Sequence, residues 1–252
     1  MHRFFIKSEQ LLPNNKAILT DENDVKHLVR VLRGEIGELV ELCVNHEKEF
    51  IGKIEAIEDQ AVYFEILKEK TVDRESPIVI HLYQGLPKAD KMEWIVQKTV
   101  ELGANAVIPV QMTRSVAKIA DEKDNKKKTD RWQKIADEAA KQSKRLANVE
   151  IRAAIRFKGV EALIAKYDLF LVPYELETST GLKPLLSTFE NPVKTIGILI
   201  GPEGGIDEVE LQKLIELGAK PITLGPRILR TETAGIATVT MLQYALGDLG
   251  GE

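Results

Sequence analysis

Hydrophobic positions divide the chain into two parts with different periodicities. Before about residue 70, short runs rich in β-branched and aromatic residues lie around Phe50 and from Ala61 to Leu67, separated by polar turns. Such runs are typical of β-strands. Residues 24–32 instead place apolar side chains three and four positions apart, which predicts a helix. The pattern indicates a small β-barrel with one helix over residues 1–70, followed by a polar linker over 71–77.

From residue 78 on, apolar strands alternate with amphipathic helices. Expected strands begin at Ile78, Ala106, Leu169, Thr195 and Pro221. Expected helices span 91–103, 130–145, 208–217 and 233–246, with Asp90, Asp207, and Thr231 or Thr233 as candidate caps. The charged tract 121–131 is expected to be a mobile loop. This alternation predicts an α/β domain over 78–252 with a mostly parallel sheet.

The composition limits the kinds of partner that the protein is expected to bind. The 35 basic and 39 acidic residues give a net charge of -4, so any nucleic-acid contact must be a local basic patch. The single cysteine excludes an intrachain disulfide, and neither a signal peptide nor a membrane-length apolar run is visible, so we expect a cytoplasmic protein without membrane association. The histidines show no metal-ligand spacing, and no metal site is expected.

Two glycine-bearing loops, 198–206 and 223–235, follow expected strands. Ligands of open α/β sheets bind beyond the carboxyl ends of strands, and glycine lets a backbone approach them closely. Neither loop matches a phosphate-binding motif, and Glu203 would suit a cationic or hydroxyl-bearing ligand better than a pyrophosphate. The alternatives are that these glycines only make tight turns, or that the chain is a nucleotide-dependent transferase, which the missing phosphate-loop lysine disfavours.

Residues 91–110, 199–205 and 224–234 together resemble the ribosomal RNA small subunit methyltransferase E family, which belongs to the SPOUT methyltransferases. The resemblance extends over essentially the whole chain. It implies a PUA-like RNA-binding β-barrel, then a methyltransferase domain with a carboxy-terminal trefoil knot, and a homodimer. It also implies S-adenosylmethionine-dependent methylation of N3 of a specific uridine in 16S ribosomal RNA, on assembled or late-precursor small subunits. A non-catalytic RNA-binding assembly factor is the alternative.

The resemblance also maps a cofactor pocket onto three loops of this chain. The implied residues are Leu171, Val172, Pro173, Ile200, Gly201, Pro202, Glu203, Gly204, Leu224, Gly225, Ile228, Leu229, Arg230 and Thr233.

The expected chemistry adds catalytic candidates. Uridine N3 becomes a good nucleophile only after losing its proton, which leaves negative charge on the base. Arg230, with Arg3 as a contributor, is expected to stabilise that charge, and Glu232 is expected to accept the proton. Alternatively, Arg230 fixes its loop by a salt bridge and Glu232 is a carboxylate favoured at a helix start.

Local basic residues are candidate RNA contacts, because lysine and arginine neutralise phosphates. They are Arg3, His27, Arg30, Arg33, Arg114 and Lys118. The basic residues of the 130–145 helix are interpreted as a solvated face. The last helix is apolar on most faces, which predicts burial all round and favours a subunit interface.

Overall fold

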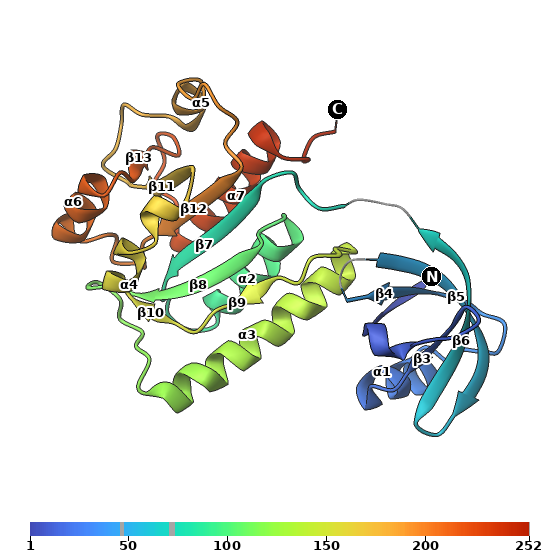
Figure 1. Cartoon of the computed structure of the whole chain (residues 1–252). Helices are drawn as coiled ribbons and strands as arrows, with labels where there is room; N and C mark the ends of the chain where they lie inside the picture. The colour runs from blue at the N-terminus through green and yellow to red at the C-terminus, as the bar shows by residue number, and fades with distance from the viewer. Residues whose placement is uncertain (46–47, 71–73, 252) are drawn as a thin grey trace. The chain divides into compact units, whose positions relative to one another are not determined.

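The computed structural model describes residues 1–45, 48–70 and 74–251, which form two compact units (Figure 1). The first unit contains Met1–Arg74 together with Lys144–Ala147. The second contains Glu75–Ser143 and Asn148–Glu252. Residues 71–73 of the expected linker lie outside the described residues. The short return of the chain to the first unit at residue 144 has no signal in the hydrophobic pattern.

The first unit is built on a six-stranded mixed sheet. Its strands, in spatial order, are β1 (His2–Ile6), β4 (Leu39–Val44), β5 (Lys48–Glu58), β6 (Ala61–Lys70), β3 (Lys16–Leu19) and β2 (Leu11–Leu12). Only the β1–β4 pair is parallel. The expected helix is present as α1 (Glu22–Lys26), capped by the Asp21 carboxylate, and continues as a π-helical turn over His27–Val31.

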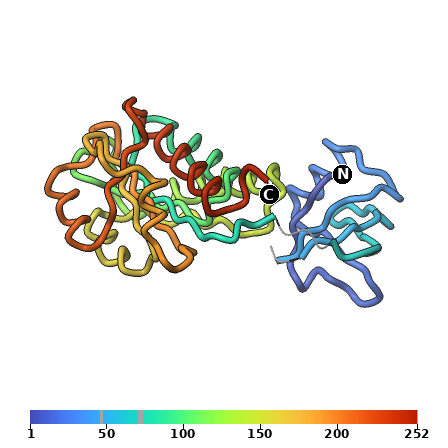
Figure 2. The backbone as a smooth tube through the Cα atoms, turned by 90° about the horizontal axis from the view of Figure 1, so that it is seen from above, coloured from blue at the N-terminus to red at the C-terminus, as the bar shows by residue number. Residues whose placement is uncertain are grey.

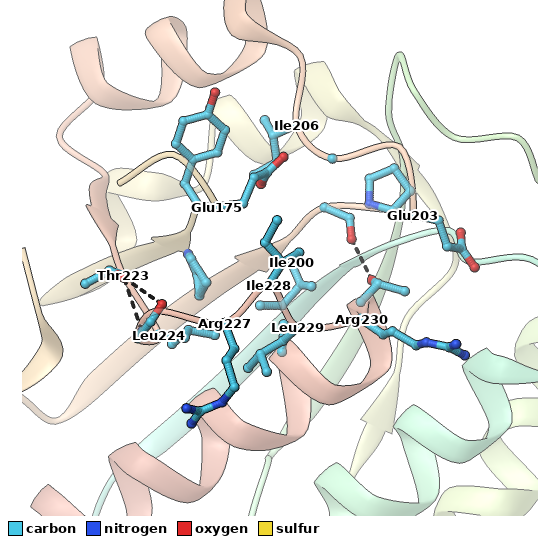
Figure 3. Close-up of a pocket in the computed structure, with 18 of the residues that line it drawn as sticks. Glu175, Ile200, Glu203, Ile206, Thr223, Leu224, Arg227, Ile228, Leu229 and Arg230 are labelled. Atoms are coloured by element: carbon cyan, nitrogen blue, oxygen red, sulfur yellow. Dashed lines mark hydrogen bonds between the residues drawn. The ribbon is translucent and has the colours of Figure 1, made fainter. Parts of the chain in front are cut away.

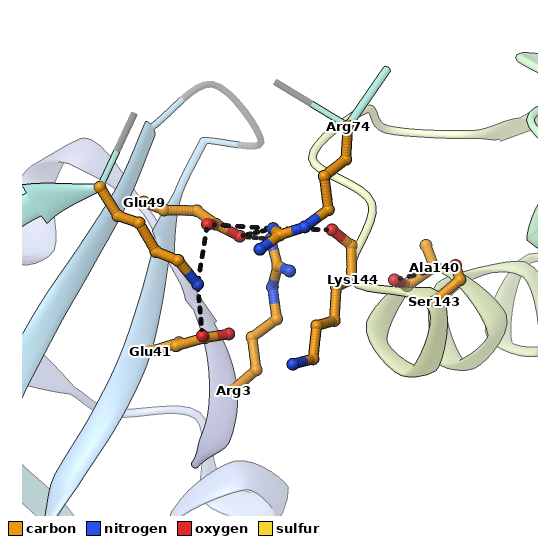
Figure 4. A network of polar contacts seen from close by, with 8 residues as sticks. Arg3, Glu41, Glu49, Arg74, Ala140, Ser143 and Lys144 are labelled. Atoms are coloured by element: carbon orange, nitrogen blue, oxygen red, sulfur yellow. Dashed lines mark hydrogen bonds and ion pairs between the residues drawn. The ribbon is translucent and has the colours of Figure 1, made fainter. Parts of the chain in front are cut away.

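A buried ion cluster crosses this sheet. The Arg3 guanidinium pairs with the fully buried Glu49 carboxylate, to which Arg74 Nη1 also donates at 3.0 and 3.1 Å (Figure 4). Lys70 Nζ donates to Glu41 at 2.6 Å. A buried carboxylate is tolerated only when it is paired in this way. The Arg3 side chain is 5% exposed and packs within its own unit, and its expected contact with substrate or RNA stays a prediction.

The second unit contains a parallel sheet, as predicted. Its strands, in spatial order, are β10 (Ile155–Arg156), β8 (Ala106–Gln111), β7 (Val79–Gly85), β12 (Thr195–Ile200), β11 (Leu169–Pro173) and β13 (Lys220–Ile222), with β9 (Glu150–Ile151) also pairing with β8. Every one of these pairs is parallel.

Helices cover both faces of this sheet. Because side chains alternate along a strand, Ile80 and Leu82 face one core and Tyr83 faces the other. On the first face lie α2 (Lys91–Glu101), α3 (Glu122–Ser143), α5 (Leu182–Leu186) and α7 (Thr231–Leu246). On the second lie α4 (Phe157–Glu161), a short 3₁₀ helix (Ile164–Lys166) and α6 (Glu208–Glu216). Helix α7 runs beside α2, as Figure 2 shows.

Helix α3 corrects one prediction. The tract expected to be a mobile loop is helical from Glu122 on, and the Asp121 carboxylate accepts the N–H of Asp124 at 2.7 Å. Lys126 pairs with Asp130, and Lys128 with Asp124, each at 2.8 Å and four residues apart. The charge pattern is therefore that of a solvated helix, stabilised by its cap and by pairs one turn apart.

The helix ends show which cap predictions succeed. Asp207 caps α6 by accepting the N–H of Val209 at 3.0 Å, as predicted. Asp90 precedes α2 but its side chain makes no cap bond, so that prediction was wrong. Within the single chain, Met241 and Tyr244 of α7 are 36% and 76% exposed, so the predicted burial of this helix on all faces would require a second subunit. Within the described part of the chain, no helix is long and apolar enough to cross a bilayer, and no cluster of side chains is arranged to hold a metal ion.

Candidate active site

Three loops meet at one edge of the parallel sheet. Strands β12, β11 and β13 are neighbours and parallel, so the loops that follow them leave from the same edge. Residues 173–175, 200–206 and 223–230 come together there around a cavity of about 480 Å³ (Figure 3). This volume falls in the range of small-molecule sites.

The structure brings most of the expected cofactor residues to this cavity. Those that line it are Pro173, Ile200, Gly201, Pro202, Glu203, Leu224, Gly225, Ile228, Leu229 and Arg230. Leu171 and Val172 are fully buried in the two cores, and Thr233 lies exposed on α7. A Cβ on Gly204 would lie 3.0 Å from the Arg114 carbonyl, so that residue packs against the β8–α3 loop.

Sequence reasoning missed several lining residues. Six of them neighbour a predicted segment of the same loop: Tyr174, Glu175, Gly205, Ile206, Thr223 and Ala234. Extending each predicted segment by two residues would have found all six. Pro226, Arg227 and Thr231, which also line the cavity, lie within the segment 224–233 to which the resemblance assigns the pocket. Lys91, at the start of α2, carries no local signal because only the fold brings it to the cavity.

Glycines shape the loops at two points. Gly205 has φ +73° and its N–H donates to the Pro202 carbonyl at 2.9 Å, which closes a tight turn. Gly225 has φ +107°, and nothing lies within 4 Å of where its Cβ would be. L-residues with side chains rarely adopt these conformations, so glycine leaves the backbone open to a ligand.

The Thr231 hydroxyl joins three separate segments beside the cavity. It donates to the Gly201 carbonyl at 2.6 Å and accepts from Gln84 Nε2 at 2.8 Å. Gln84 is fully buried at the end of β7. Next to it, a Cβ on Gly85 would lie 2.6 Å from the Pro202 nitrogen, so the loop after β12 passes in direct contact with β7. The cavity floor is thus fixed by buried polar groups that have few alternative partners.

A small ion cluster, formed by Lys91, Glu203 and Glu232, borders the cavity. Lys91 Nζ lies 3.0 Å from Glu203 Oε1 and 3.2 Å from Glu232 Oε2. Burial alone would raise the pKa of Glu203, but hydrogen bonds from Lys91 and from the Lys88 N–H keep it below its ordinary value. The hydrogen bond to Glu203 raises the pKa of Lys91 in turn. Both charges therefore persist at neutral pH.

The two catalytic candidates on the last loop occupy different environments. Arg230 immediately precedes α7, lines the cavity and is exposed, and among the described residues its guanidinium has no ion-pair or hydrogen-bond partner. Its interpretation as a loop-fixing salt bridge thus finds no support in the structure. Glu232 lies in the first turn of α7, is 17% exposed, and reaches the cavity only through Lys91.

The RNA-contact candidates other than Arg3 all lie at the surface. Arg114 Nη1 donates to the Gly204 carbonyl at 3.4 Å and its Nε lies 3.5 Å from Asp207, which places this side chain beside the loop after β12. Lys118 is exposed on the same β8–α3 segment. In the first unit, the exposed candidates are His27, Arg30 and Arg33.

Comparison with known proteins now decides the family. An RNA methyltransferase domain model matches residues 74–243, and an RNA methyltransferase PUA domain model matches residues 19–67. The ribosomal RNA small subunit methyltransferase E of Bacillus subtilis is 34% identical over 256 residues, with all of both chains covered. The chain belongs to the ribosomal RNA small subunit methyltransferase E family. Its Aquifex aeolicus member is 34% identical over 244 residues, 96% of this chain and 99% of that one.

Solved structures agree with this assignment to the methyltransferase E family. The Neisseria gonorrhoeae enzyme bound to S-adenosyl methionine superposes with a TM-score of 0.85 at 33% identity, covering 98% of this chain and 99% of that one. A Legionella pneumophila methyltransferase in complex with its cofactor SAM gives a TM-score of 0.83 at 32% identity, covering 98% of each chain. The predicted family, enzyme class and two-part fold with a PUA-like first domain are confirmed.

The Thr231 link generates a first prediction. Thr231→Val should lower the free energy of unfolding by about 1–3 kcal/mol, because the part-buried Gly201 carbonyl and the buried Gln84 amide each lose a partner. Thr240→Val is the matched control, since that hydroxyl on the same helix only contacts the preceding-turn carbonyl of Ile236. Urea unfolding of both variants measures the difference. Equal losses would show that the link contributes nothing particular.

The Lys91 cluster generates a second prediction, about pH. A carboxyl whose pKa is lowered by folding contributes stability above its unfolded pKa, and this is lost as the pH falls through its folded pKa. Glu203→Gln should therefore melt at a lower temperature than the parent protein at pH 7, and the gap should close below about pH 4. Melting curves between pH 3 and 8 test this. Glu190→Gln, at an exposed carboxylate, is the control. A difference in melting temperature between Glu203→Gln and the parent protein that does not change with pH would contradict this explanation.

Proposed function

We propose that this protein transfers a methyl group from S-adenosylmethionine to N3 of a specific uridine in 16S ribosomal RNA. The observation that carries the proposal is the cavity at the three strand-end loops, lined by ten residues that the family resemblance assigns to the cofactor. Relatives of more than 30% identity over nearly the whole chain bind this cofactor. Assembled or late-precursor small subunits would be the substrate, which places the protein in the cytoplasm.

The lining chemistry fits S-adenosylmethionine better than a nucleotide. The ligand carries a sulfonium, an ammonium and a ribose but no phosphate, and it would supply an electrophilic methyl group when bound. Ile200, Leu224 and Leu229 offer apolar walls for a flat base, while the Glu175 carboxylate offers a negative group for a cation. Backbone groups of 223–229 would hold the polar edges, because Gly225 leaves the main chain accessible there.

Arg230 is the residue we assign to charge stabilisation. Deprotonation of the uridine imide spreads negative charge onto the two flanking carbonyl oxygens, and a planar guanidinium matches paired oxygens. The Arg230 guanidinium is exposed at the cavity and has no partner among the described residues. No existing ion pair therefore has to break when it contacts the base. A fixed positive charge that meets developing negative charge lowers the barrier of the transfer.

Glu232 is the proton acceptor in this scheme. The proton on N3 would move to a Glu232 carboxylate oxygen. The methyl group would pass to N3 as its bond to the sulfonium sulfur breaks, and the electron pair of that bond would stay on the sulfur of the departing neutral thioether. The contact of Glu232 with Lys91 must be shared or released for the proton to move, because the ammonium lies 3.2 Å from Oε2. Lys91 would therefore orient this carboxylate toward the mouth of the cavity.

Substrate RNA would be held by basic residues of both units. The exposed His27, Arg30 and Arg33 are our candidates on the PUA-like domain, and Arg114 and Lys118 are those beside the cavity. Phosphate contacts of this kind position the RNA without reading its sequence.

The trefoil knot also belongs to the proposal. After the edge strand β13, residues 223–230 run back across the sheet to reach Gly201 and Gln84 near its middle. On the way, the Thr223 N–H donates to the Thr180 carbonyl at 2.9 Å. This path supports passage of the carboxy-terminal chain through the loop that follows β11, and an experimental chain trace through residues 174–230 tests it.

A homodimer accounts for the apolar face that α7 leaves exposed. Met241 and Tyr244 lie on this face. Light scattering should give twice the mass of one chain, and the double variant Met241→Asp/Tyr244→Asp should give the mass of one chain, because two buried carboxylates would lack partners. Val209→Asp is the control, since Val209 is 64% exposed on α6. A parent protein with the mass of a single chain would rule out this dimer.

The activity is tested on small subunits from cells that lack the enzyme. Radiolabelled S-adenosylmethionine should give label in N3-methyluridine after nucleoside digestion. Arg230→Ala should lower kcat by about 10²–10³-fold and Glu232→Gln by about 10²–10⁴-fold, the usual losses for an electrostatic group and a general base. Lys166→Ala, at an exposed lysine of the second unit, controls for surface changes.

The outcomes of this assay separate the remaining hypotheses. Cofactor binding without any transfer to small subunits would indicate the non-catalytic assembly factor. Absence of cofactor binding would overturn the cofactor assignment itself. Label in another nucleoside would keep the methyltransferase and reject the uridine N3 target.

A further inference from the structure

Positive charge is concentrated on the amino-terminal half of α3. Residues 123–134 contain six basic and two acidic residues, in a chain whose net charge is -4. The two acidic residues, Asp124 and Asp130, are each paired with a lysine four positions away. The helix therefore carries more cations than its own carboxylates neutralise.

Three of these cations form one stripe. Lys123, Lys127 and Lys134 are four and seven positions apart, which places them within about 40° of each other around the helix and over about 16 Å of its length. All three are exposed, and none has an ion-pair or hydrogen-bond partner for its ammonium among the described residues. The side chains of the stripe and its neighbours surround a surface hollow. The opposite side of α3 packs into the core through Trp132 and Ala136.

One flank of this lysine stripe reaches the cavity through α2. Arg131, adjacent to the stripe, pairs with Glu93 and lies 3.7 Å from Asp90. These two carboxylates are on either side of Lys91, which lines the cavity. The start of α2 is thus shared between the α3 surface and the candidate active site.

The other connection runs through the β8–α3 segment. Lys128 Nζ donates to the Lys118 carbonyl at 3.2 Å, and the same segment carries Arg114 to the Gly204 carbonyl beside the cavity. The segment that leads from beside the loop after β12 to α3 therefore carries two further exposed cations, Arg114 and Lys118, with the exposed Asp121 and Glu122 between Lys118 and the stripe. A solvated helix face would account for the lysines on α3, but not for the exposed cations of this segment beside the cavity.

We propose that Lys123, Lys127 and Lys134 bind phosphates of the ribosomal RNA strand that flanks the methylated nucleotide. This inference rests on the proposed function and adds a substrate contact outside the PUA-like domain. Lysine ammonium groups are compact charges that neutralise phosphates without reading bases, so the stripe would position the strand and leave target choice to other contacts. Such contacts make binding strongly dependent on salt.

The test removes the three positive charges of the stripe and keeps a polar side chain at each position. The triple variant Lys123→Gln/Lys127→Gln/Lys134→Gln should raise KM for small subunits by about tenfold or more at moderate salt, and should make the log–log salt dependence of RNA binding shallower by about 2–3. The kcat at saturating subunits and the affinity for S-adenosylmethionine should stay within about twofold, because no cavity residue changes. The matched control is Lys158→Gln/Lys166→Gln/Lys183→Gln, three exposed lysines of the same unit.

The possible outcomes test the lysine stripe and the proposed function separately. A stripe variant that behaves like the control overturns the inference, while methylation by the parent protein keeps the proposed function intact. A raised KM on subunits together with unchanged binding and salt dependence on protein-free 16S RNA would point to a ribosomal protein as the partner, which also overturns it. Absence of methylation by the parent protein concerns the proposed function alone, and the salt dependence of RNA binding still tests the stripe.

Discussion

The site depends on one hydroxyl. Thr231 is the point where the end of β7, the loop after β12 and the start of α7 are held together, through Gln84 Nε2 and the Gly201 carbonyl. Strands β7 and β12 are paired up to Gln84 and Ile200, and the Thr231 hydroxyl joins the start of α7 to the end of that ladder. Because the groups are buried, water cannot replace a lost partner, so the arrangement of the cavity floor follows from this small set of hydrogen bonds.

The charged side chains near the cavity fall into two groups, those that are paired with each other and those for which the described part of the chain shows no partner. Lys91 is committed to two carboxylates, and Glu203 is committed to Lys91 and a backbone N–H. Arg230 and the three lysines of the stripe have no such partner among the described residues. In a chain with a slight excess of acidic residues, unpaired cations around one cavity indicate where an anionic substrate would lie.

The sequence predicted the second unit well because its signals are local. The apolar run of β7 and the glycine loops after β12 and β13 are visible in neighbouring residues, and they lead directly to the parallel sheet and the cavity edge. Lys91 and Gln84 could not be predicted, since their roles arise from contacts between distant segments. The pairing of Arg3 with the buried Glu49 could not be predicted either, because an arginine in a sequence does not show which carboxylate it contacts.

The composition of the first unit has a consequence for how this protein can be divided. Lys144–Ala147, inserted between α3 and β9, belong to that unit, where the Lys144 carbonyl accepts from Arg74. The chain therefore crosses the boundary between its two units three times. A fragment that ends at Arg74 lacks part of its own unit, and exchanging the PUA-like domain between relatives would require transplanting two separated pieces of sequence at once.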